Sequence, residues 1–389
     1  MNATNTNTTK FKNTKFSWLM ITGLIIATGI IGLFLVNQSK PTTINTFRAA
    51  PFNHVKPSIH PSARPSALVS PTNVRNAYNL STGAVGSGTI AIVDAYDDPT
   101  AQTDLAVFDK QFGLAVCTTA NNCFEQHKMT NNIRTNSDWA VEEALDVQWA
   151  HAIAPGAKIL LVEAATDSGT NLLNAINYAR SRSDVVAVSL SWGGNEFPTE
   201  ASFESNLTSP YGATFFAAAG DDGHGTAWPA ASANVVAVGG SSLKLDANGN
   251  FISESAWADG GGGLSSYIKE PAWQTSYGVP QAAGHRAMPD VAYNADPNSG
   301  YAVYDSTPYF GYRGWFQVGG TSAGTPQWAA LRAIDPSLTA AKLYGDAKST
   351  PADFRDITTG TNGSCGFFCT ASTGYDYTTG LGSPLTKAF

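Results

Sequence analysis

The 389-residue sequence has no excess of positive charge: 23 lysines and arginines stand against 30 aspartates and glutamates, for a net charge of −7. No basic cluster stands out that could displace the counterions of a nucleic acid, which excludes nucleic acid as a partner. No repeat of 20–50 residues is evident either. With 43% hydrophobic residues and 37 glycines, the composition indicates a globular α/β protein with many tight turns.

Cysteine is also scarce. The four cysteines form two close pairs, Cys117/Cys123 and Cys365/Cys369. Neither pair has C-x-x-C spacing, although His127, four residues after Cys123, keeps a zinc site open as an alternative. We predict two local disulfides, because a predicted export signal precedes them and disulfides form in oxidising compartments.

The first 40 residues contain four lysines and no acidic residue. Within them, residues 16–36 carry no charge and are numerous enough to span a bilayer about 30 Å thick. A cleaved signal peptide is the alternative, but its apolar region is usually about 7–15 residues long, and 36–40 make a poor cleavage site. We therefore predict a transmembrane signal anchor at 16–36. The lysines before it place 1–15 in the cytoplasm and the rest of the chain outside.

Residues 37–73 contain six prolines among serine, threonine and asparagine, and we predict an extended linker there. From residue 74 onward, apolar strands alternate with helices. The predicted strands are 89–93, 158–163, 185–191, 214–219 and 235–238, and the predicted helices are 101–112, 138–153 and 171–180. This alternation predicts a doubly wound, mostly parallel α/β sheet flanked by helices. In such sheets functional side chains gather beyond the carboxyl ends of the strands.

Ser322 lies in a glycine-flanked turn, 319–326, between a short apolar strand, 315–318, and a helix-compatible segment, 327–334. Such a turn presents the serine hydroxyl at a helix N-terminus, free of backbone bulk. This is the geometry of an activated nucleophile, although an ordinary Gly/Ser/Thr turn has the same composition. The G-T-S-A-x-x-P arrangement also resembles the nucleophile turn of the subtilisin-like fold, which subtilisins and sedolisins share.

The sequence offers no histidine that could be placed as a base beside this serine. His224 begins an H-G-T motif like that of the subtilisin histidine. However, it follows 217–221, the segment where subtilisins carry their oxyanion-hole asparagine, and it is not on the earlier helix. We expect His224 in a loop at the mouth of the site. His151 is on the predicted helix 138–153, but two turns too late and on another face. A neutral subtilisin-type hydrolase therefore has little support.

The helix 138–153 carries two acids instead. Glu142 and Asp146 are four residues apart, so both carboxyls project from one helical face. A solvent-facing acidic stripe would have the same spacing. The neighbouring tryptophans, valines and leucine nevertheless indicate a helix that packs on the sheet.

Three motifs, in chain order, resemble the sedolisin family of serine-carboxyl peptidases: the Glu-x-x-x-Asp pair at 142–146, Ala-Gly-Asp at 219–221 and Gly-Thr-Ser-Ala at 320–323. Further matching segments are 154–159, 189–193, 261–263 with Ser265, 271–274, 289–291, 356–358, 374–376 and 379–384. The resemblance covers 74–389 and implies a peptidase domain with a subtilisin-like fold.

The resemblance also implies a mechanism. Ser322 would attack the peptide carbonyl, and Glu142 would take its proton and return it to the leaving amine. Asp146 would orient Glu142 and share a proton with it. Asp221 falls at the family's oxyanion position, where a carboxyl must be protonated to donate a hydrogen bond. Because both roles need protonated carboxyls, we expect a serine endopeptidase that acts at acidic pH.

Asp94 falls where some sedolisins extend this network through a tryptophan, here Trp192, although Asp94 could equally cap the end of its strand. The family's large N-terminal prodomain is not matched between the predicted anchor and residue 74. We therefore expect an enzyme that folds unaided, is assisted by a separate chain, or is not held latent in the usual way. The alternative function is a catalytically inactive relative that binds peptides outside the cell.

The C-terminal run resembles the family's calcium site and implies one bound Ca²⁺. Its ligands would be the side chains of Asp356 and Asp376 and the carbonyls of Ile357, Ser372 and Gly374. Ser372 stands where glycine is usual, and an Asp/Gly turn without metal is the alternative. The expected partners are peptide or protein substrates and, through the anchor, a membrane. We expect a monomer outside the cytoplasm, anchored, or secreted if the anchor is cleaved.

Overall fold

The computed structural model describes residues 43–57, 69–81 and 83–385, which belong to one compact unit. The predicted cytoplasmic tail, 1–15, and the predicted transmembrane segment, 16–36, lie outside the described residues. Among the described residues, none of the helices has both the length and the apolarity that crossing a bilayer requires.

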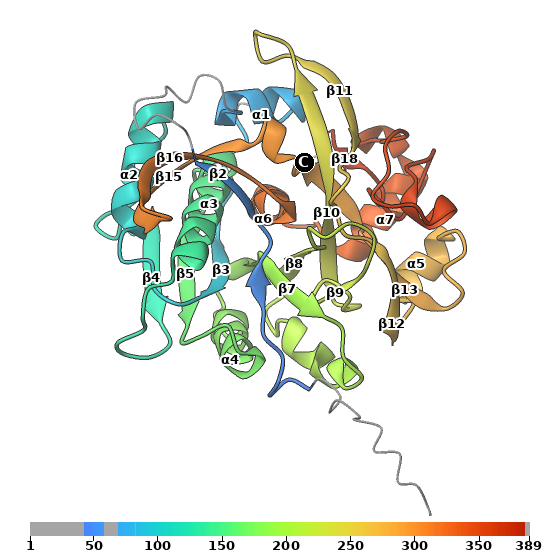
Figure 1. Cartoon of the computed structure of the whole chain (residues 1–389), viewed down its shortest axis with the longest axis horizontal. Coiled ribbons are helices and arrows are strands. Elements are labelled where there is room, and N and C mark those ends of the chain that lie inside the picture. Colours follow the sequence, from blue (N-terminus) through green and yellow to red (C-terminus); the bar gives the residue numbers. More distant parts are fainter. Residues whose placement is uncertain (1–42, 58–68, 82, 386–389) are drawn as a thin grey trace, which may run out of the picture. The chain divides into compact units, whose positions relative to one another are not determined.

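The central element is an eight-stranded sheet in the order β11-β10-β8-β6-β3-β5-β4, with β14 paired to β10 beside this path (Figure 1). The neighbouring strands run parallel, except for the antiparallel pair β10–β11. The strands are β3 (Thr89–Ala95), β4 (Phe124–Lys128), β5 (Lys158–Ala164), β6 (Val185–Leu190), β8 (Thr214–Ala218), β10 (Val235–Leu245), β11 (Phe251–Ala256) and β14 (Val291–Asn294). The predicted mostly parallel α/β sheet is confirmed.

Both faces of this sheet are buried. On β3, Ile90 and Ile92 belong to one hydrophobic core and Ala91 and Val93 to the other. This two-sided burial explains why the central strands read as continuous apolar runs. The first core also contains side chains of α2 (Ala101–Phe112), α3 (Ser137–Ile153) and α6 (Thr321–Ile334), and the second contains those of α4 (Gly169–Arg180).

Smaller sheets and helices complete the described fold. The small sheets are β1 (Ala50–Pro51), β7 (Trp192–Asn195) and β9 (Ala227–Trp228); β15 (Tyr301–Tyr309), β16 (Tyr312–Gly319) and β2 (His54–Pro57); β12 (Gly263–Lys269) and β13 (His285–Met288); and β17 (Phe354–Arg355) and β18 (Ser383–Pro384). The other helices are α1 (Pro71–Ala77), α5 (Ala272–Tyr277), α7 (Ala340–Ser349), η2 (Glu200–Leu207), η3 (Pro297–Ser299), η4 (Pro351–Asp353) and η5 (Gly366–Cys369).

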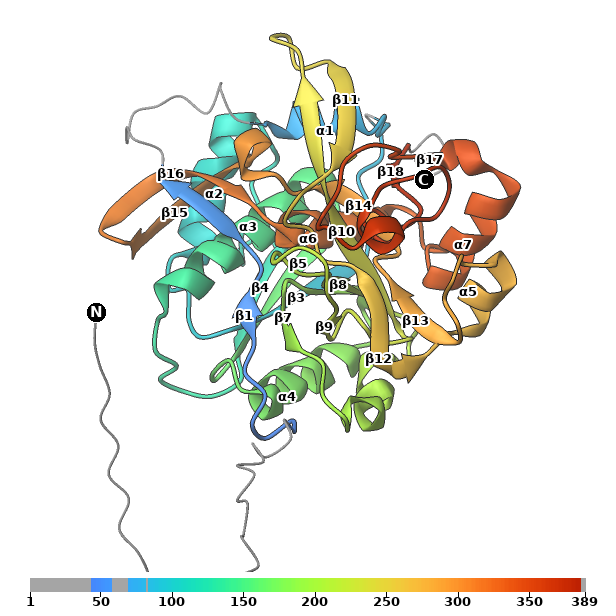
Figure 2. The same ribbon diagram turned by 45° about the vertical axis from the view of Figure 1, so that its right-hand side comes forward.

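Part of the predicted linker, 37–73, is built into the fold. Strand β1 pairs antiparallel with β7, and β2 pairs antiparallel with β16. Figure 2 shows both strands in blue, passing β7 and reaching the β15–β16 hairpin. Two of the six prolines that suggested a linker lie at the ends of these strands, Pro51 in β1 and Pro57 in β2. Both strands are at sheet edges, where a missing N–H donor is tolerated.

The strand before Ser322 also differs from expectation. Residues 315–318 belong to β16, which is in a small antiparallel sheet and not in the central one. The helix after it, α6, begins at Thr321 and not at 327. Ser322 therefore lies within the first helical turn.

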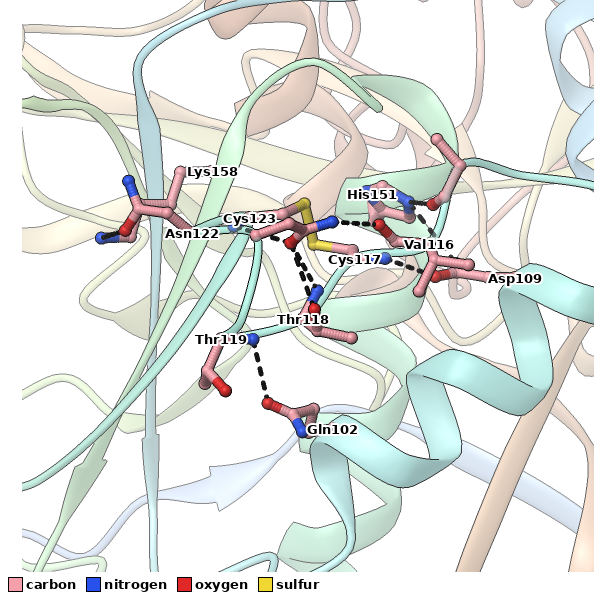
Figure 3. The surroundings of a disulfide bond; sticks show 12 residues. Gln102, Asp109, Val116, Cys117, Thr118, Thr119, Asn122, Cys123, His151 and Lys158 are labelled. Carbon is pink, nitrogen blue, oxygen red and sulfur yellow. Dashed lines mark hydrogen bonds and ion pairs between the residues drawn. A yellow bond between two sulfur atoms is a disulfide. The ribbon is translucent and has the colours of Figure 1, made fainter.

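Both cysteine pairs are disulfides, as predicted. The alternative zinc ligand, His127, instead stacks on Tyr178, with ring centroids 3.7 Å apart. Beside the first disulfide, His151 lies next to Asp109, with His151 Nε2 3.4 Å from Asp109 Oδ1 (Figure 3). His151 therefore points from α3 towards Asp109 of α2.

Candidate active site

Ser322 is positioned by the start of α6. Gly320, at the N-cap, has φ +113°, a conformation that side-chain-bearing residues rarely adopt. The Ser322 hydroxyl donates to the backbone oxygen of Ser191 at 2.9 Å. Its backbone N–H donates to the oxygen of Phe52 at 3.2 Å. Ser322 is thus held, fully buried, between the end of β6 and the N-terminal segment.

The predicted acidic pair lies on α3, which packs against α6. The helix starts at the N-cap Asn136, whose side chain accepts from the N–H groups of residues 138 and 139. Glu142 is fully buried and accepts a hydrogen bond from Asn53 Nδ2. Burial, followed by the charge of Asp94, raises the pKa of Glu142 well above its usual range, while hydrogen bonds from Ser322 and Asn53 oppose the rise.

Asp146 and Asp94 complete a buried cluster of carboxyls with Glu142. Burial raises the pKa of Asp146 well above its usual range, and the charges of Asp94 and Glu142 add to the rise. Burial also raises the pKa of Asp94, at the end of β3, to about 8. The indole of Trp192, however, donates to the oxygen of Val93 at 2.7 Å. The single indole N–H of Trp192 therefore binds a backbone oxygen, and it does not donate to Asp94 as expected.

Asp221 follows β8 and faces the start of α6. Its Oδ1 accepts from Thr321 N at 2.8 Å and from Thr321 Oγ1 at 2.7 Å. No described residue donates a hydrogen bond to its buried Oδ2. Burial raises the pKa of Asp221 to about 8, against smaller opposing effects of the bonds from Thr321. The bonds from Thr321 thus orient the Asp221 side chain and leave its Oδ2 without a hydrogen-bond partner among the described residues.

The structure brings Glu142, Asp146, Asp221 and Ser322 together, as the motifs suggest. His224 is exposed and lines the nearby cavity described below, which agrees with the expected position at the mouth. No histidine of the described residues hydrogen-bonds Ser322. Among the described residues, the candidate base beside the Ser322 hydroxyl is therefore the carboxyl of Glu142.

Two residues near the site were not anticipated because they fall in the predicted linker. Asn53 contacts Glu142, and His54 Nε2 lies 3.6 Å from Asp221 Oδ2. Their local sequence carries no periodic signal, since β1 and β2 are too short to show one. The backbone of Ser191 was also missed as an acceptor, although it directly precedes the matching Trp192-Gly193 motif.

A cavity of about 220 Å³ opens beside Asp221. It lies between the end of β7 and the loop that follows β8. Its lining includes Phe52, Gly194, Asn195, Asp221, His224 and Gly261. The glycines leave room for a side chain next to the carboxyl of Asp221.

The predicted calcium ligands also come together. Asp356 Oδ2 accepts from Gly374 N at 3.0 Å, and Asp376 Oδ2 accepts from Ser372 N at 3.0 Å. The carbonyl oxygens of Ile357, Ser372 and Gly374 accept no hydrogen bond from the described residues. Two carboxylates beside three unused carbonyls form an all-oxygen donor set that fits a hard cation.

Comparisons with known proteins find relatives over most of the chain. Over 83% of its length, the chain is 35% identical to kumamolisin from Bacillus sp. (strain MN-32). It is also 27% identical, over 80% of its length, to sedolisin from Pseudomonas sp. (strain 101). The solved structure of Pseudomonas sedolisin, complexed with two molecules of pseudo-iodotyrostatin, matches with a TM-score of 0.69 over 82% of this chain and 95% of that one, at 27% identity. The chain belongs to the sedolisin family.

No family model matches the sequence. The chain spans 63% of the length of kumamolisin and 59% of that of sedolisin. The structural match to Pseudomonas sedolisin shows that the chain has the sedolisin-like α/β fold, with a mostly parallel central sheet and helices.

Proposed function

We propose that this chain is a serine-carboxyl endopeptidase that hydrolyses peptide bonds at acidic pH. The observation that carries the proposal is the position of buried Ser322 in the first turn of α6, which packs against the helix of buried Glu142, with Asp221 bound to the neighbouring Thr321. One relative is named tripeptidyl-peptidase 1, from Dictyostelium discoideum, and the solved sedolisin is described as a serine-carboxyl proteinase, so an inactive peptide-binding module is not favoured.

In the proposed reaction, the Ser322 hydroxyl turns its proton from the oxygen of Ser191 towards Glu142. The oxygen then attacks the carbonyl carbon of the substrate as Glu142 accepts the proton. Asp146, on the same face of α3, shares a proton with Glu142 and orients it. Glu142 afterwards returns the proton to the leaving amine, and water releases the acyl group by the reverse sequence.

The negative charge that develops on the substrate oxygen needs donors. We assign this role to the backbone N–H of Ser322 and to protonated Asp221 Oδ2. The bonds from Thr321 hold Asp221 Oδ1 and leave Oδ2 for the substrate. With a pKa of about 8, Asp221 keeps its proton throughout the acidic range. Ionisation at higher pH would place a carboxylate against the developing oxyanion.

We also propose that Asp356, Asp376 and the carbonyls of Ile357, Ser372 and Gly374 hold one Ca²⁺. When bound, the ion would supply charge that neutralises the two carboxylates and ties loop 372–376 to residues 356–357. Its contribution is to stability, because this loop makes no contact with Ser322 among the hydrogen bonds of the described residues.

For its location, we propose an extracytoplasmic domain tethered by the segment 16–36. The two disulfides support an oxidising compartment.

The test is hydrolysis of quenched peptides by the full chain over roughly pH 2–9, where carboxyls and histidines titrate. We expect activity in acid that is lost above about pH 8, where Asp221 ionises, that is abolished by Ser322→Ala and that is lowered about 10²–10⁴-fold by Glu142→Gln. Glu143→Gln is the matched control, because Glu143 is equally buried on the same helix but its largest charge partner is Glu163. Alkaline activity that survives Glu142→Gln would refute the proposed mechanism.

A further inference from the structure

The first disulfide, Cys117–Cys123, lies in the loop between α2 and β4 and beside a histidine of α3 (Figure 3). The two sulfur atoms and a ring nitrogen of His151 all lie within 4.8 Å of one another. Cys117 and His151 are fully buried, whereas Cys123 is half-buried, so the group can be reached from solvent on one side. Two cysteines and one histidine are a common ligand set for zinc. The disulfide uses both sulfurs, so these residues can bind a metal only in the reduced chain.

The hydrogen bonds of His151 determine which of its ring nitrogens is available. Nε2 lies 2.8 Å from the carbonyl oxygen of Ala115 and 3.4 Å from Asp109 Oδ1. A carbonyl oxygen can only accept, so Nε2 carries the proton, and Nδ1 of the neutral ring has a free lone pair. No described residue donates a hydrogen bond to the buried Nδ1. Because buried polar atoms are normally paired, an unused lone pair beside two sulfurs points to a ligand that is not yet bound.

The surroundings of Nε2 match those of a metal-bound histidine. Such a histidine donates its other ring N–H to a carboxylate or a backbone carbonyl, which fixes the tautomer and the orientation of the ring. Both kinds of acceptor are present here, in Asp109 Oδ1 and the oxygen of Ala115. Asp109 is held in turn by Cys117 N, which donates to its Oδ2 at 3.0 Å. The histidine, its orienting carboxylate and the cysteine loop therefore form one connected unit.

Two other histidines lie near a cysteine, but neither has these surroundings. His127, only four residues after Cys123, has its ring stacked on Tyr178. His224 lies within 4.8 Å of both sulfurs of the second pair, but His224 and Cys365 are exposed. Only His151 combines burial, a free ring nitrogen and an orienting carboxylate among the described residues.

We propose that Cys117, Cys123 and His151 bind one zinc ion when the disulfide between the two cysteines is reduced. Reduction adds two electrons and two protons to the disulfide, and a dithiol reductant supplies both and becomes a disulfide itself. Zinc then binds the two sulfurs as thiolates, which release two protons to solvent, and binds the neutral imidazole through Nδ1. The fourth position of the tetrahedral ion is left to water.

The geometry permits this exchange with a small local movement. Zinc–sulfur bonds of about 2.3 Å place two bound thiolates about 3.8 Å apart, and rotation of the half-buried Cys123 side chain provides this separation. Disulfide and zinc are thus alternative cross-links of one loop, and the zinc also ties the loop to α3 through His151. Because the ion needs both sulfurs, oxidation expels it and reduction readmits it. This site does not depend on the proposed peptidase function.

The experiment compares the oxidised full chain with the same chain reduced by a phosphine, which becomes a phosphine oxide with oxygen from water. Both samples, at neutral pH and with Ca²⁺ present, receive Zn²⁺, are freed of unbound metal and are analysed for zinc per chain. Alkylation mapped by mass spectrometry shows which thiols the metal covers. We expect additional zinc on the reduced chain only, and alkylation of Cys117 and Cys123 slowed about tenfold or more. Zinc should also raise the Tm of the reduced chain.

His151→Gln removes a ligand and should weaken zinc binding by the reduced chain about 100-fold or more, beyond the usual effect of losing an orienting partner. His127→Gln is the matched control and should bind zinc as the parent does. If His151→Gln does not fold, Asp109→Ala gives a second test, with an expected loss of about 10–100-fold.

Three results would overturn the site. The first is equal zinc on the oxidised and reduced chains. The second is protection of Cys365 and Cys369 alone, or a loss of binding in His127→Gln that the folded His151→Gln or Asp109→Ala does not show. The third is a reduced chain whose zinc content and Tm do not respond to added Zn²⁺.

Discussion

Replacement of Asp221 by asparagine separates the donor role of this residue from its titration. The amide is close in shape to the protonated carboxyl. Its oxygen can still accept from Thr321 N and Oγ1, and its NH₂ group then stands where Oδ2 stands now. Asp221→Asn should therefore keep kcat at acidic pH within about tenfold of the parent, whereas Asp221→Ala should lose about 10²–10³-fold, the usual cost of one oxyanion donor.

The pH dependence is the sharper readout. The parent Asp221 has a pKa of about 8, raised chiefly by burial. Above that pH it ionises, and kcat should fall about tenfold per pH unit as the donor is lost. The asparagine variant has no such proton, so the alkaline limb that Asp221 causes should disappear and any remaining limb should lie at higher pH.

Asp222→Asn is the matched control. Asp222 is exposed, and its charge adds to the raised pKa of Asp221. Its removal should shift the alkaline limb slightly downward, opposite to the effect of Asp221→Asn. The assay is kcat at saturating quenched peptide from pH 3 to 10. An alkaline limb that stays in place in Asp221→Asn, with a loss as large as in Asp221→Ala, would refute the assigned role.

Three further predictions concern the surroundings of the site. Gly320→Ala should lower kcat at least 10²-fold and destabilise the fold by about 1–3 kcal/mol, because the added Cβ would overlap the Phe52 oxygen and φ is +113°; activity assays and urea unfolding check this. The raised carboxyl pKa values mean that the folded chain binds more protons than the unfolded one between about pH 4 and 8. The free energy of unfolding should thus fall by about 1.4 kcal/mol for each such proton and each unit by which the pH rises. A Tm of Ser322→Ala that falls as the pH is raised would show this. Calcium at 100 times its Kd should add about 2.7 kcal/mol, a gain that Asp376→Ala abolishes in calorimetry; an unchanged Tm in the parent would contradict the calcium site.

The sequence was most informative where burial dictates the residue pattern. The bounds of α3, Ser137–Ile153, lie within one residue of the predicted 138–153, because its cap and the Pro155-Gly156 stop are local signals. The central strands were equally clear, since a strand buried on both faces is a continuous apolar run. Strand β4, with the sequence FEQHK, was missed because, as an edge strand, it buries only Phe124.

The site was only partly predictable, for a related reason. Motif order identified Glu142, Asp146, Asp221 and Ser322, which the fold brings to one place. The segment 50–57 gave no signal, because β1 and β2 owe their conformation to the strands they pair with, β7 and β16. The sequence of such a short strand does not indicate which segment, more than 100 residues away, it pairs with. The same limit hid the link from Asn53 to Glu142.

Burial of the carboxyl cluster links stability and catalysis to one variable, the pH. The fold removes Glu142, Asp146, Asp94 and Asp221 from water without a cationic side chain among their hydrogen-bond partners in the described residues. Such a cluster is tolerated only if protons replace the missing counter-charges. Those protons are the ones that the proposed reaction needs, on the Glu142–Asp146 pair and on Asp221.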